Sequence, residues 1–296
     1  MKLSSCHDTA LAMALPVTAL FLGLPGLVRA QSPAASRPAT QKGDTAQAAL
    51  AKLLAKEGVR VDKAKGRVHA EGHVNLTRDY IEYVAIGPRG KKHEALVMLK
   101  CKGSTLNAAL LALGLKPGKN VDFKPVVPLP SEEEVMKGAP TSIVVPPEGP
   151  RLFLTLSWHD DKQVEHAYPV EDLILDVRAD APVQGAEWIY FGGMTMPILR
   201  GEPPVYVADY EQDYITTYFT KPDSHLITIK HPKARFDDNW WPNAKLLPKR
   251  GTPCTLTLSL KPFVKHAPRP APAKPARSQP SKKQPATRKQ TSAGCR

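Results

Sequence analysis

The alternation of apolar and polar positions predicts strands through most of this chain and helices at two places in its first half. Between residues 80 and 118, an aromatic and β-branched run, a Pro-Gly turn and the continuous apolar run Ala95–Leu99 predict two strands, the second buried on both faces. Ser104 then predicts the cap of a helix near 104–114, which Gly114 ends. Because the interior of that helix is almost entirely apolar, we expect it in the core.

A short N-terminal helix is predicted over residues 44–58, from a sequence typical of a capping box and from leucines that recur on one side. A hairpin follows over residues 59–76, because apolar side chains recur there at every second position. Its other face presents His69, Glu71 and His73 in a row. Such a row can bind a divalent metal, and it is also typical of the solvated face of a half-buried hairpin.

From Arg151 onward the pattern predicts one strand after another, separated by clusters of Pro, Gly and Asp. The Pro-rich and acidic connection before it, residues 126–150, is expected to wrap the surface. The predicted strands are 152–158, 164–170, 173–177, 187–191, 205–208, 214–219, 226–229 and 254–260. The expected fold class is α+β: β-rich and mostly antiparallel, with one buried helix near 104–114 and a short N-terminal helix. We expect a single domain over residues 44–262.

Four motifs in order carry a resemblance to a known family. They are GKKHEALV from Gly90, NAALLALGLKPG from Asn107, EWIYFGG from Glu187 and VYVAD from Val205. Together they resemble the YdjY-like domain family of bacterial secreted proteins, across residues 59–260. The resemblance implies no particular activity. The family pattern places a His at the start of the Ala-Leu-Leu helix, where this chain has Asn107.

The N-terminus predicts a protein that works outside the cytoplasm. Lys2 precedes an apolar run over residues 10–27 that two prolines interrupt, and Ala30 closes a site of the kind that signal peptidases cleave. We expect a secreted or periplasmic protein after cleavage near Ala30, the alternative being an uncleaved membrane anchor. Residues 31–43 are predicted to be a linker, and we expect no transmembrane span in the mature protein.

The formal net charge of +13 is concentrated at the C-terminus, where residues 263–296 hold nine Lys and Arg and no Asp or Glu. The basic residues there have no interleaved aromatic side chains on which bases could stack, so we expect no specific nucleic-acid binding. The tail is rich in Pro and is expected to be disordered. It is expected to attract anionic envelope components, the alternative being an inert, soluble extension.

Three cysteines follow the predicted cleavage site. Cys101 and Cys254 either pair in a disulfide or remain two buried thiols, and their spacing matches no metal motif. Cys295, near the end of the tail, is expected to be the more reactive thiol.

Residues that carry chemistry are sparse. His93-Glu94 begins like the HExxH zinc motif, but an apolar residue stands where the second His is required. The pair remains a candidate acid/base or polar ligand site, the alternative being that it closes a strand end by hydrogen bonds. His159 and His166, near a hairpin turn, form a second candidate polar cluster. Asn107 completes the set of candidate ligand residues.

Two further groups have competing interpretations. Asp209, Glu211 and Asp213 alternate as calcium-binding carboxylates can, but without the Gly of a calcium loop they predict a solvated turn. Trp240 and Trp241 lie in an apparent loop, where we expect at least one to be an exposed contact residue.

Together these features favour a secreted or periplasmic, non-catalytic domain that binds a protein or a small ligand at the cell envelope. No complete catalytic set is present in the sequence. The alternative is a metal-dependent or acid/base enzyme that uses His93 and Glu94. No cofactor is predicted, with a divalent metal as the alternative.

Overall fold

The computed structural model describes residues 40–262, so the predicted leader, most of the predicted linker and the basic tail lie outside the described residues. The chain divides into two units between Gly43 and Asp44. Helix α1 spans Thr40–Lys56. It begins four residues before Asp44, so the predicted start of this helix, and the capping box assigned to it, are wrong.

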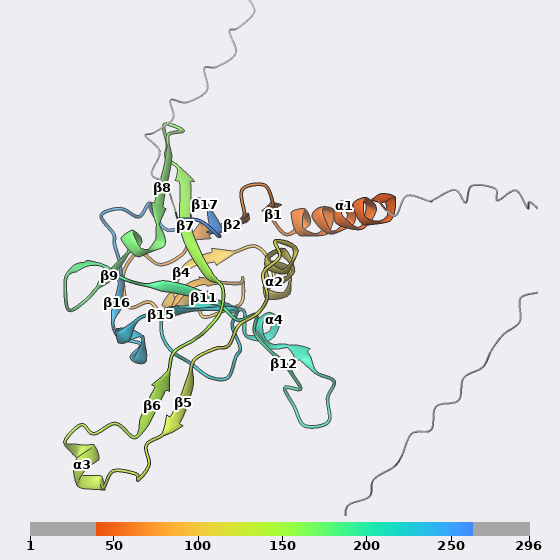
Figure 1. Cartoon of the computed structure of the whole chain (residues 1–296). Helices are drawn as coiled ribbons and strands as arrows, with labels where there is room; N and C mark the ends of the chain where they lie inside the picture. Colours follow the sequence, from red (N-terminus) through yellow and green to blue (C-terminus); the bar gives the residue numbers. More distant parts are fainter. Residues whose placement is uncertain (1–39, 263–296) are drawn as a thin grey trace, which may run out of the picture. The chain divides into compact units, whose positions relative to one another are not determined.

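A sheet that closes on itself forms the body of the second unit (Figure 1). Its strands are β1 (Val59–Asp62), β2 (Arg67–Val74), β3 (Tyr83–Ile86), β4 (Ala95–Leu99), β7 (Arg151–His159), β8 (Glu165–Pro169), β11 (Glu187–Tyr190), β14 (Asp213–Thr216), β15 (Ile227–Lys230) and β17 (Pro253–Ser259). The order β2-β17-β7-β11-β15-β14-β3-β4 returns to β2, because β4 also pairs with β2. These strands make a closed eight-stranded barrel, with β1 added beside β2 and β8 added beside β7.

The predicted β-rich, mostly antiparallel class is confirmed in outline. Only the β3–β4 and β14–β15 pairs of this sheet are parallel among the described residues. The closure into a barrel goes beyond the prediction. It removes the two exposed edges that an open sheet of these strands would have.

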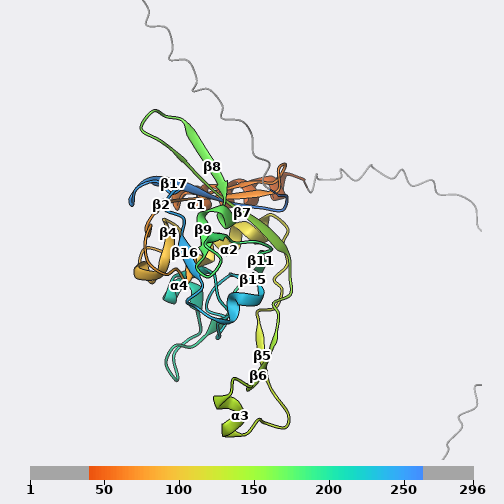
Figure 2. The ribbon, with the colours of Figure 1, turned by 90° about the vertical axis from the view of Figure 1, so that its left-hand side faces the viewer.

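Smaller elements surround the barrel. They are α2 (Gly103–Ala112), α3 (Glu132–Met136), α4 (Val207–Glu211), η1 (Lys92–Glu94), η2 (Val170–Leu173), η3 (Pro232–Arg235), β5 (Asp122–Pro125), β6 (Ser142–Val145), β9 (Ile174–Asp176), β10 (Ala181–Pro182), β12 (Thr195–Met196), β13 (Val205–Tyr206) and β16 (Trp240–Pro242). β5 and β6 pair as an arm that carries α3 away from the barrel (Figures 1 and 2). Between residues 40 and 262, no helix combines the length and the apolar character that a membrane crossing requires.

The strands of the barrel alternate as the sequence pattern predicts. On β2, Val68, Ala70 and Val74 are fully buried, whereas His69, Glu71 and His73 face outward. Gly72 belongs to the inward set. A Cβ at this position would lie 2.4 Å from the backbone oxygen of Met98, so only Gly allows β2 to approach β4 this closely.

Helix α2 packs one side into the core, as expected for the helix near 104–114, and its other side is exposed. Leu106 and Leu110 are fully buried, whereas Leu111 is 46% exposed. The helix begins at Gly103, so the side chain of Ser104 is not its cap. The backbone N–H of Ser104 instead donates to Asp209 Oδ1 of α4 at 2.7 Å, so a carboxylate from another element caps this end.

The predicted strand at 205–208 is wrong beyond its second residue, because Val207 begins helix α4. The predicted solvated turn that follows is also wrong for Asp213, which is buried in β14. Its carboxylate forms an ion pair with Lys91 at 3.1 Å. A charged partner is what allows a carboxylate to be buried at this position.

The prediction of an apparent loop at Trp240 and Trp241 is wrong, because both residues lie in strand β16, which pairs with β9. Trp240 is fully buried and its Nε1–H donates to the backbone oxygen of Thr217 at 2.6 Å. Trp241 is half-buried and contacts the Tyr80 ring edge-on, at 5.2 Å between ring centroids. Neither tryptophan is therefore a fully exposed contact residue.

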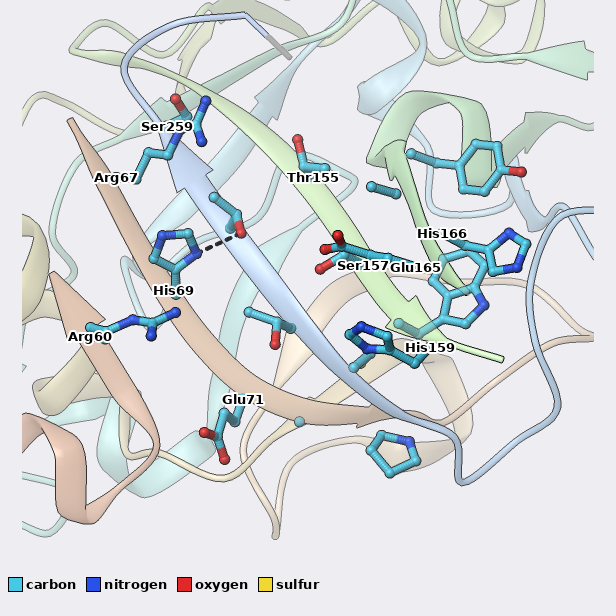
Figure 3. Close-up of a pocket in the computed structure, with 18 of the residues that line it drawn as sticks. Arg60, Arg67, His69, Glu71, Thr155, Ser157, His159, Glu165, His166 and Ser259 are labelled. Atoms are coloured by element: carbon cyan, nitrogen blue, oxygen red, sulfur yellow. Dashed lines mark hydrogen bonds between the residues drawn. The ribbon is translucent and has the colours of Figure 1, made fainter. Parts of the chain in front are cut away.

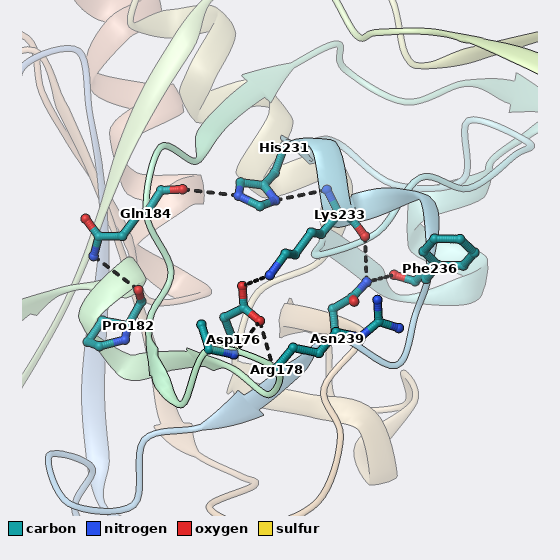
Figure 4. A network of polar contacts seen from close by, with 9 residues as sticks. Asp176, Arg178, Pro182, Gln184, His231, Lys233, Phe236 and Asn239 are labelled. Carbon is teal, nitrogen blue, oxygen red and sulfur yellow. Dashed lines mark hydrogen bonds and ion pairs between the residues drawn. The ribbon is translucent and has the colours of Figure 1, made fainter.

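A network of polar contacts holds η3 and β16 against β9 (Figure 4). Lys233 pairs with Asp176, and the backbone N–H of Lys233 donates to His231 Nδ1 at 3.1 Å. The side-chain amide of Asn239 donates to the backbone oxygens of Lys233 and Phe236. These contacts fix the segment before Trp240, where the sequence pattern predicts a loop.

Cys101 and Cys254 are both buried free thiols. Cys254 lies in β17 and Cys101 lies just beyond the end of β4; strand β2 lies between β17 and β4, since Gly72 pairs with Cys254 on one side and with Leu99 on the other. Two strand spacings amount to about 9.6 Å, which exceeds the Cα separation of a disulfide. Of the two predicted possibilities, the structure therefore shows two buried thiols and no disulfide between them. Burial raises the pKa of each thiol to about 12.

Candidate functional site

The outward faces of β1, β2, β17, β7 and β8 line a pocket of about 950 Å³, called here the outer pocket (Figure 3). The polar faces of these strands point away from the barrel interior, so the lining is made of hydroxyl, imidazole, guanidinium and carboxylate groups. A smaller cavity of about 620 Å³ beside it, under α1, shares Arg60, His69, Glu71 and Thr255 with the outer pocket.

Strand register aligns the outward side chains of the outer pocket in rows. Thr257 of β17 lies opposite His69 of β2 and opposite Thr155 of β7. The next row joins Glu71, Thr255 and Ser157 in the same way. Neighbouring strands are about 4.8 Å apart and alternate residues along a strand about 6.8 Å apart, so the hydroxyl groups form a regular grid.

His69 is the half-buried group at the centre of this grid. Its Nδ1 lies 2.9 Å from Thr257 Oγ1. Burial and the nearby guanidinium groups of Arg60 and Arg67 lower the pKa of His69, so the ring is neutral at pH 7. Within residues 40–262, no carboxylate contacts its other ring nitrogen. The His–Thr contact therefore lacks the third group that orients the base in a hydrolytic triad.

The structure brings His159 and His166 to the outer pocket as well. His159 is exposed at the end of β7, whereas His166 stacks on Trp158 at 5.8 Å between ring centroids and contacts Asp160 Oδ2 at 3.0 Å through Nε2. The predicted metal row of His69, Glu71 and His73 does lie on one outward face, but Glu71 is paired with Lys100 at 2.8 Å. No group of three or more His, Cys, Asp or Glu residues in the described chain is placed to share a metal ion.

His93 and Glu94 lie apart from the outer pocket, in η1 at the start of β4. His93 Nε2 and Glu94 Oε1 are 2.6 Å apart, and the His93 side chain is 75% exposed. The backbone N–H of Glu82 donates to the Glu94 backbone oxygen at 2.8 Å, which aligns the two glutamates directly before the parallel strands β3 and β4. We call Glu82 and Glu94 the carboxyl pair.

The carboxyl pair is an unusual contact between two acids. Burial and the neighbouring Glu94 carboxylate raise the pKa of Glu82 to about 7. Glu94 Oε2 is buried and has no hydrogen-bond donor among the described residues. A protonated Glu82 can donate to the Glu94 carboxylate and does not repel it, so the contact between the two acids favours the protonated form of Glu82.

A chain of polar contacts runs beside the carboxyl pair. Lys91 Nζ donates to Tyr83 Oη at 2.7 Å and pairs with Asp213, and Tyr83 Oη lies 3.3 Å from Tyr218 Oη. The pKa of Lys91 is raised, because the Asp213 carboxylate outweighs the opposing effect of burial. Burial raises the pKa of Tyr83 and Tyr218, so both phenols remain protonated at neutral pH.

The remaining candidate, Asn107, does not join either group. Its Oδ1 accepts a hydrogen bond from the Tyr190 hydroxyl at 2.6 Å, which links α2 to β11. This contact gives Asn107 a structural role.

Sequence reasoning missed Glu82 and the hydroxyl rows of β7 and β17. The rows had a visible signal, since Thr255, Thr257 and Ser259 alternate with apolar residues. The sequence contains no signal for the carboxyl pair, because residues 82 and 94 become neighbours only through the parallel pairing of β3 with β4.

Comparison with known proteins adds one match. Residues 59–197 match the family model of the YdjY domain. This range includes β1 to β12, and the barrel is completed by β14, β15 and β17 beyond it. No curated protein and no solved structure matches this chain.

Proposed function

The chain contains a YdjY domain at residues 59–197, and we propose that it acts as a non-catalytic binding domain at the cell envelope, with the outer pocket as its ligand site. The observation that carries this proposal is the lining of that pocket. Its volume of about 950 Å³ is at the upper end of the usual range for ligand sites, and its side chains offer many hydrogen-bond donors and acceptors. The one His–Thr contact lacks the partner that a nucleophile needs.

The site of action belongs to the same proposal. The leader pattern supports export, with Gln31 as the first residue of the mature protein. N-terminal sequencing of protein recovered from the periplasm or the medium tests this directly. A retained Met1 would contradict cleavage at this site.

The basic tail is proposed to hold the domain to anionic envelope surfaces. Residues 263–296 supply nine cations without an acid, and the weak attractions of many cations to an anionic surface add up. Removal of the tail should abolish salt-sensitive retention on vesicles that contain anionic phospholipid and leave the melting temperature unchanged. Retention equal to that of the full chain would exclude the tethering role.

A variant that fills the outer pocket tests the binding proposal. Thr255 lies in the middle row of the pocket, so Thr255→Trp should block it. Lys124→Trp on the exposed strand β5 is the matched control. We expect a thermal-shift screen of envelope-derived small molecules and sugars to find ligands that stabilise the parent and Lys124→Trp but not Thr255→Trp. Equal stabilisation of all three proteins would show that the outer pocket is not the site.

The carboxyl pair favours a second candidate function, an acid/base or metal-dependent enzyme that uses His93 and Glu94. A carboxyl group with a pKa near 7 is suited to proton transfer at neutral pH, and His93 contacts Glu94 at the surface. Metal analysis of the purified mature protein separates the metal-dependent form of this candidate from the binding proposal. Stoichiometric zinc, copper or iron that disappears in His93→Ala would support the enzyme.

A further inference from the structure

The outer pocket has more positive than negative charge. Five Lys or Arg side chains and two Glu side chains line it. One of the two acids, Glu71, is already paired with Lys100 at 2.8 Å. The remaining cations face a pocket that contains few anions, which favours a ligand with negative charge.

The excess positive charge is concentrated at one end, where Arg60 and Arg67 lie on either side of His69 (Figure 3). Arg60 is the cross-strand partner of His69, and Arg67 precedes His69 by two residues on the same face of β2. Neither guanidinium forms an ion pair or a hydrogen bond with a described residue. The nearest acid in register is Asp62, and it is bound by both the backbone N–H and the ammonium of Lys65.

The same two guanidinium groups act on His69, whose pKa is lowered chiefly by burial. Besides burial, the charges of Arg60 and Arg67 disfavour a proton on the imidazole. An oxyanion placed between the two guanidiniums would neutralise that field. It would also use the forked donor geometry of arginine, which matches carboxylate and phosphate groups.

Hydroxyl groups continue from this end along the pocket. Ser259 lies opposite Arg67 and Thr257 opposite His69, and Thr255 and Ser157 form the next row. Each hydroxyl can both donate and accept, as the hydroxyls of a sugar do. A ligand that fits both features therefore carries an oxyanion at one end and a series of hydroxyl groups along its length.

We propose that the outer pocket binds an acidic carbohydrate, with a carboxylate or phosphate of the ligand held between Arg60 and Arg67 and its hydroxyls bound by the Thr and Ser side chains of β17 and β7. This inference rests on the proposed function and specifies the ligand of the same site. Carboxylate and phosphate share the chemistry that the two guanidiniums recognise, and the probes below separate them.

The test is an NMR titration of the full-length, ¹⁵N-labelled chain, because this readout separates the pocket from the tail. The probes are trigalacturonic acid for the carboxylate, mannose 6-phosphate for the phosphate and maltotriose as the neutral sugar. We expect one or both acidic probes, and not maltotriose, to shift the amide signals of Thr257 and Ser259 to saturation at 0.15 M salt.

Paired variants identify the groups responsible. Arg60→Gln/Arg67→Gln should weaken binding of the acidic probe tenfold or more. Lys116→Gln/Lys245→Gln removes the same charge from exposed positions outside the pocket and should change affinity less than twofold. Dispersion of the amide spectrum reports whether each variant is folded. If the double arginine variant is unfolded, the affinities of the single Arg60→Gln and Arg67→Gln variants for the acidic probe are compared with that of the parent instead.

The remaining outcomes overturn the inference. Shifts confined to residues 263–296 would assign binding to the tail. Equal binding of maltotriose would refute the requirement for an acid and leave the proposed binding function standing. Unchanged affinity in the folded arginine variants, or no shift of the pocket amides with any probe, would also refute the inference. The screen with Thr255→Trp decides the binding function separately.

Discussion

Replacement of Glu82 by Gln should stabilise the folded protein at neutral and alkaline pH. Glu82 and Glu94 are aligned by the parallel β3–β4 pair, and Glu94 Oε2 is buried without a donor among the described residues. At high pH both acids are ionised and repel each other. The new carboxamide in Glu82→Gln has almost the same shape, carries no charge and can donate an N–H to the Glu94 carboxylate at every pH.

The sign and size of the effect follow from proton affinity. Burial and Glu94 raise the pKa of Glu82 from 4.5 to about 7 in the folded protein. The folded state therefore binds the proton more tightly than the unfolded chain, and the free energy of unfolding falls as pH rises from about 4.5 through about 7. Each tenfold change in proton affinity corresponds to about 1.4 kcal/mol, so the free energy of unfolding can fall by at most about 3.4 kcal/mol over this pH range. Because Glu82 is only half-buried, solvent screening reduces this to roughly 1–2 kcal/mol.

Urea denaturation at pH 5 and pH 8 measures the effect. We expect Glu82→Gln to exceed the parent by roughly 1–2 kcal/mol at pH 8 and to match it closely at pH 5. Glu202→Gln, at an exposed position, should match the parent at both pH values. Burial lowers the pKa of His225, but this group titrates alike in all three proteins and cancels. Equal losses of stability between pH 5 and pH 8 in the parent and in Glu82→Gln would refute the reasoning.

Three further predictions test the packing. Leu110→Ala should lower the free energy of unfolding by about 2–5 kcal/mol in urea denaturation, whereas Leu111→Ala on the exposed side of the same helix should cost under about 1 kcal/mol; equal costs would contradict the half-buried helix. Trp240→Phe should cost about 1–3 kcal/mol, because a buried backbone carbonyl loses its donor; a melting temperature equal to that of the parent would argue against this hydrogen bond. Cys101 and Cys254 should resist a thiol reagent in the native chain and react after denaturation, as peptide mass mapping would show; rapid native labelling would mean that they are not buried.

Much of the fold could be predicted from local pattern. The hairpin of β1 and β2, the buried strand β4, the helix near 104–114 and strands β7, β8, β11, β15 and β17 all follow from apolar periodicity and turn residues. The errors arose where a distant partner changes the local preference. Val207 belongs to a β-branched and aromatic stretch typical of a strand, yet it begins α4, and Trp240 joins β16 because β9 and a polar network hold that segment.

The candidate site likewise contains residues that could be placed from the sequence and neighbours that could not. His69 and Glu71 could be placed on one outward face from the sequence, because side chains alternate along a strand. Their neighbours could not be predicted, since the register of β17 brings Thr257, 188 positions away, opposite His69, and β7 adds Thr155 to the same row.

The sequence by itself determined most of the elements, the inward and outward faces of their strands and the uneven distribution of charge, because each depends on residues close together in the chain. Only the tertiary structure decided that the sheet closes into a barrel, that Arg60 and Arg67 lie beside a grid of hydroxyls, and that Glu82 contacts Glu94. Strand order and register decide these contacts, and both depend on packing across the whole domain.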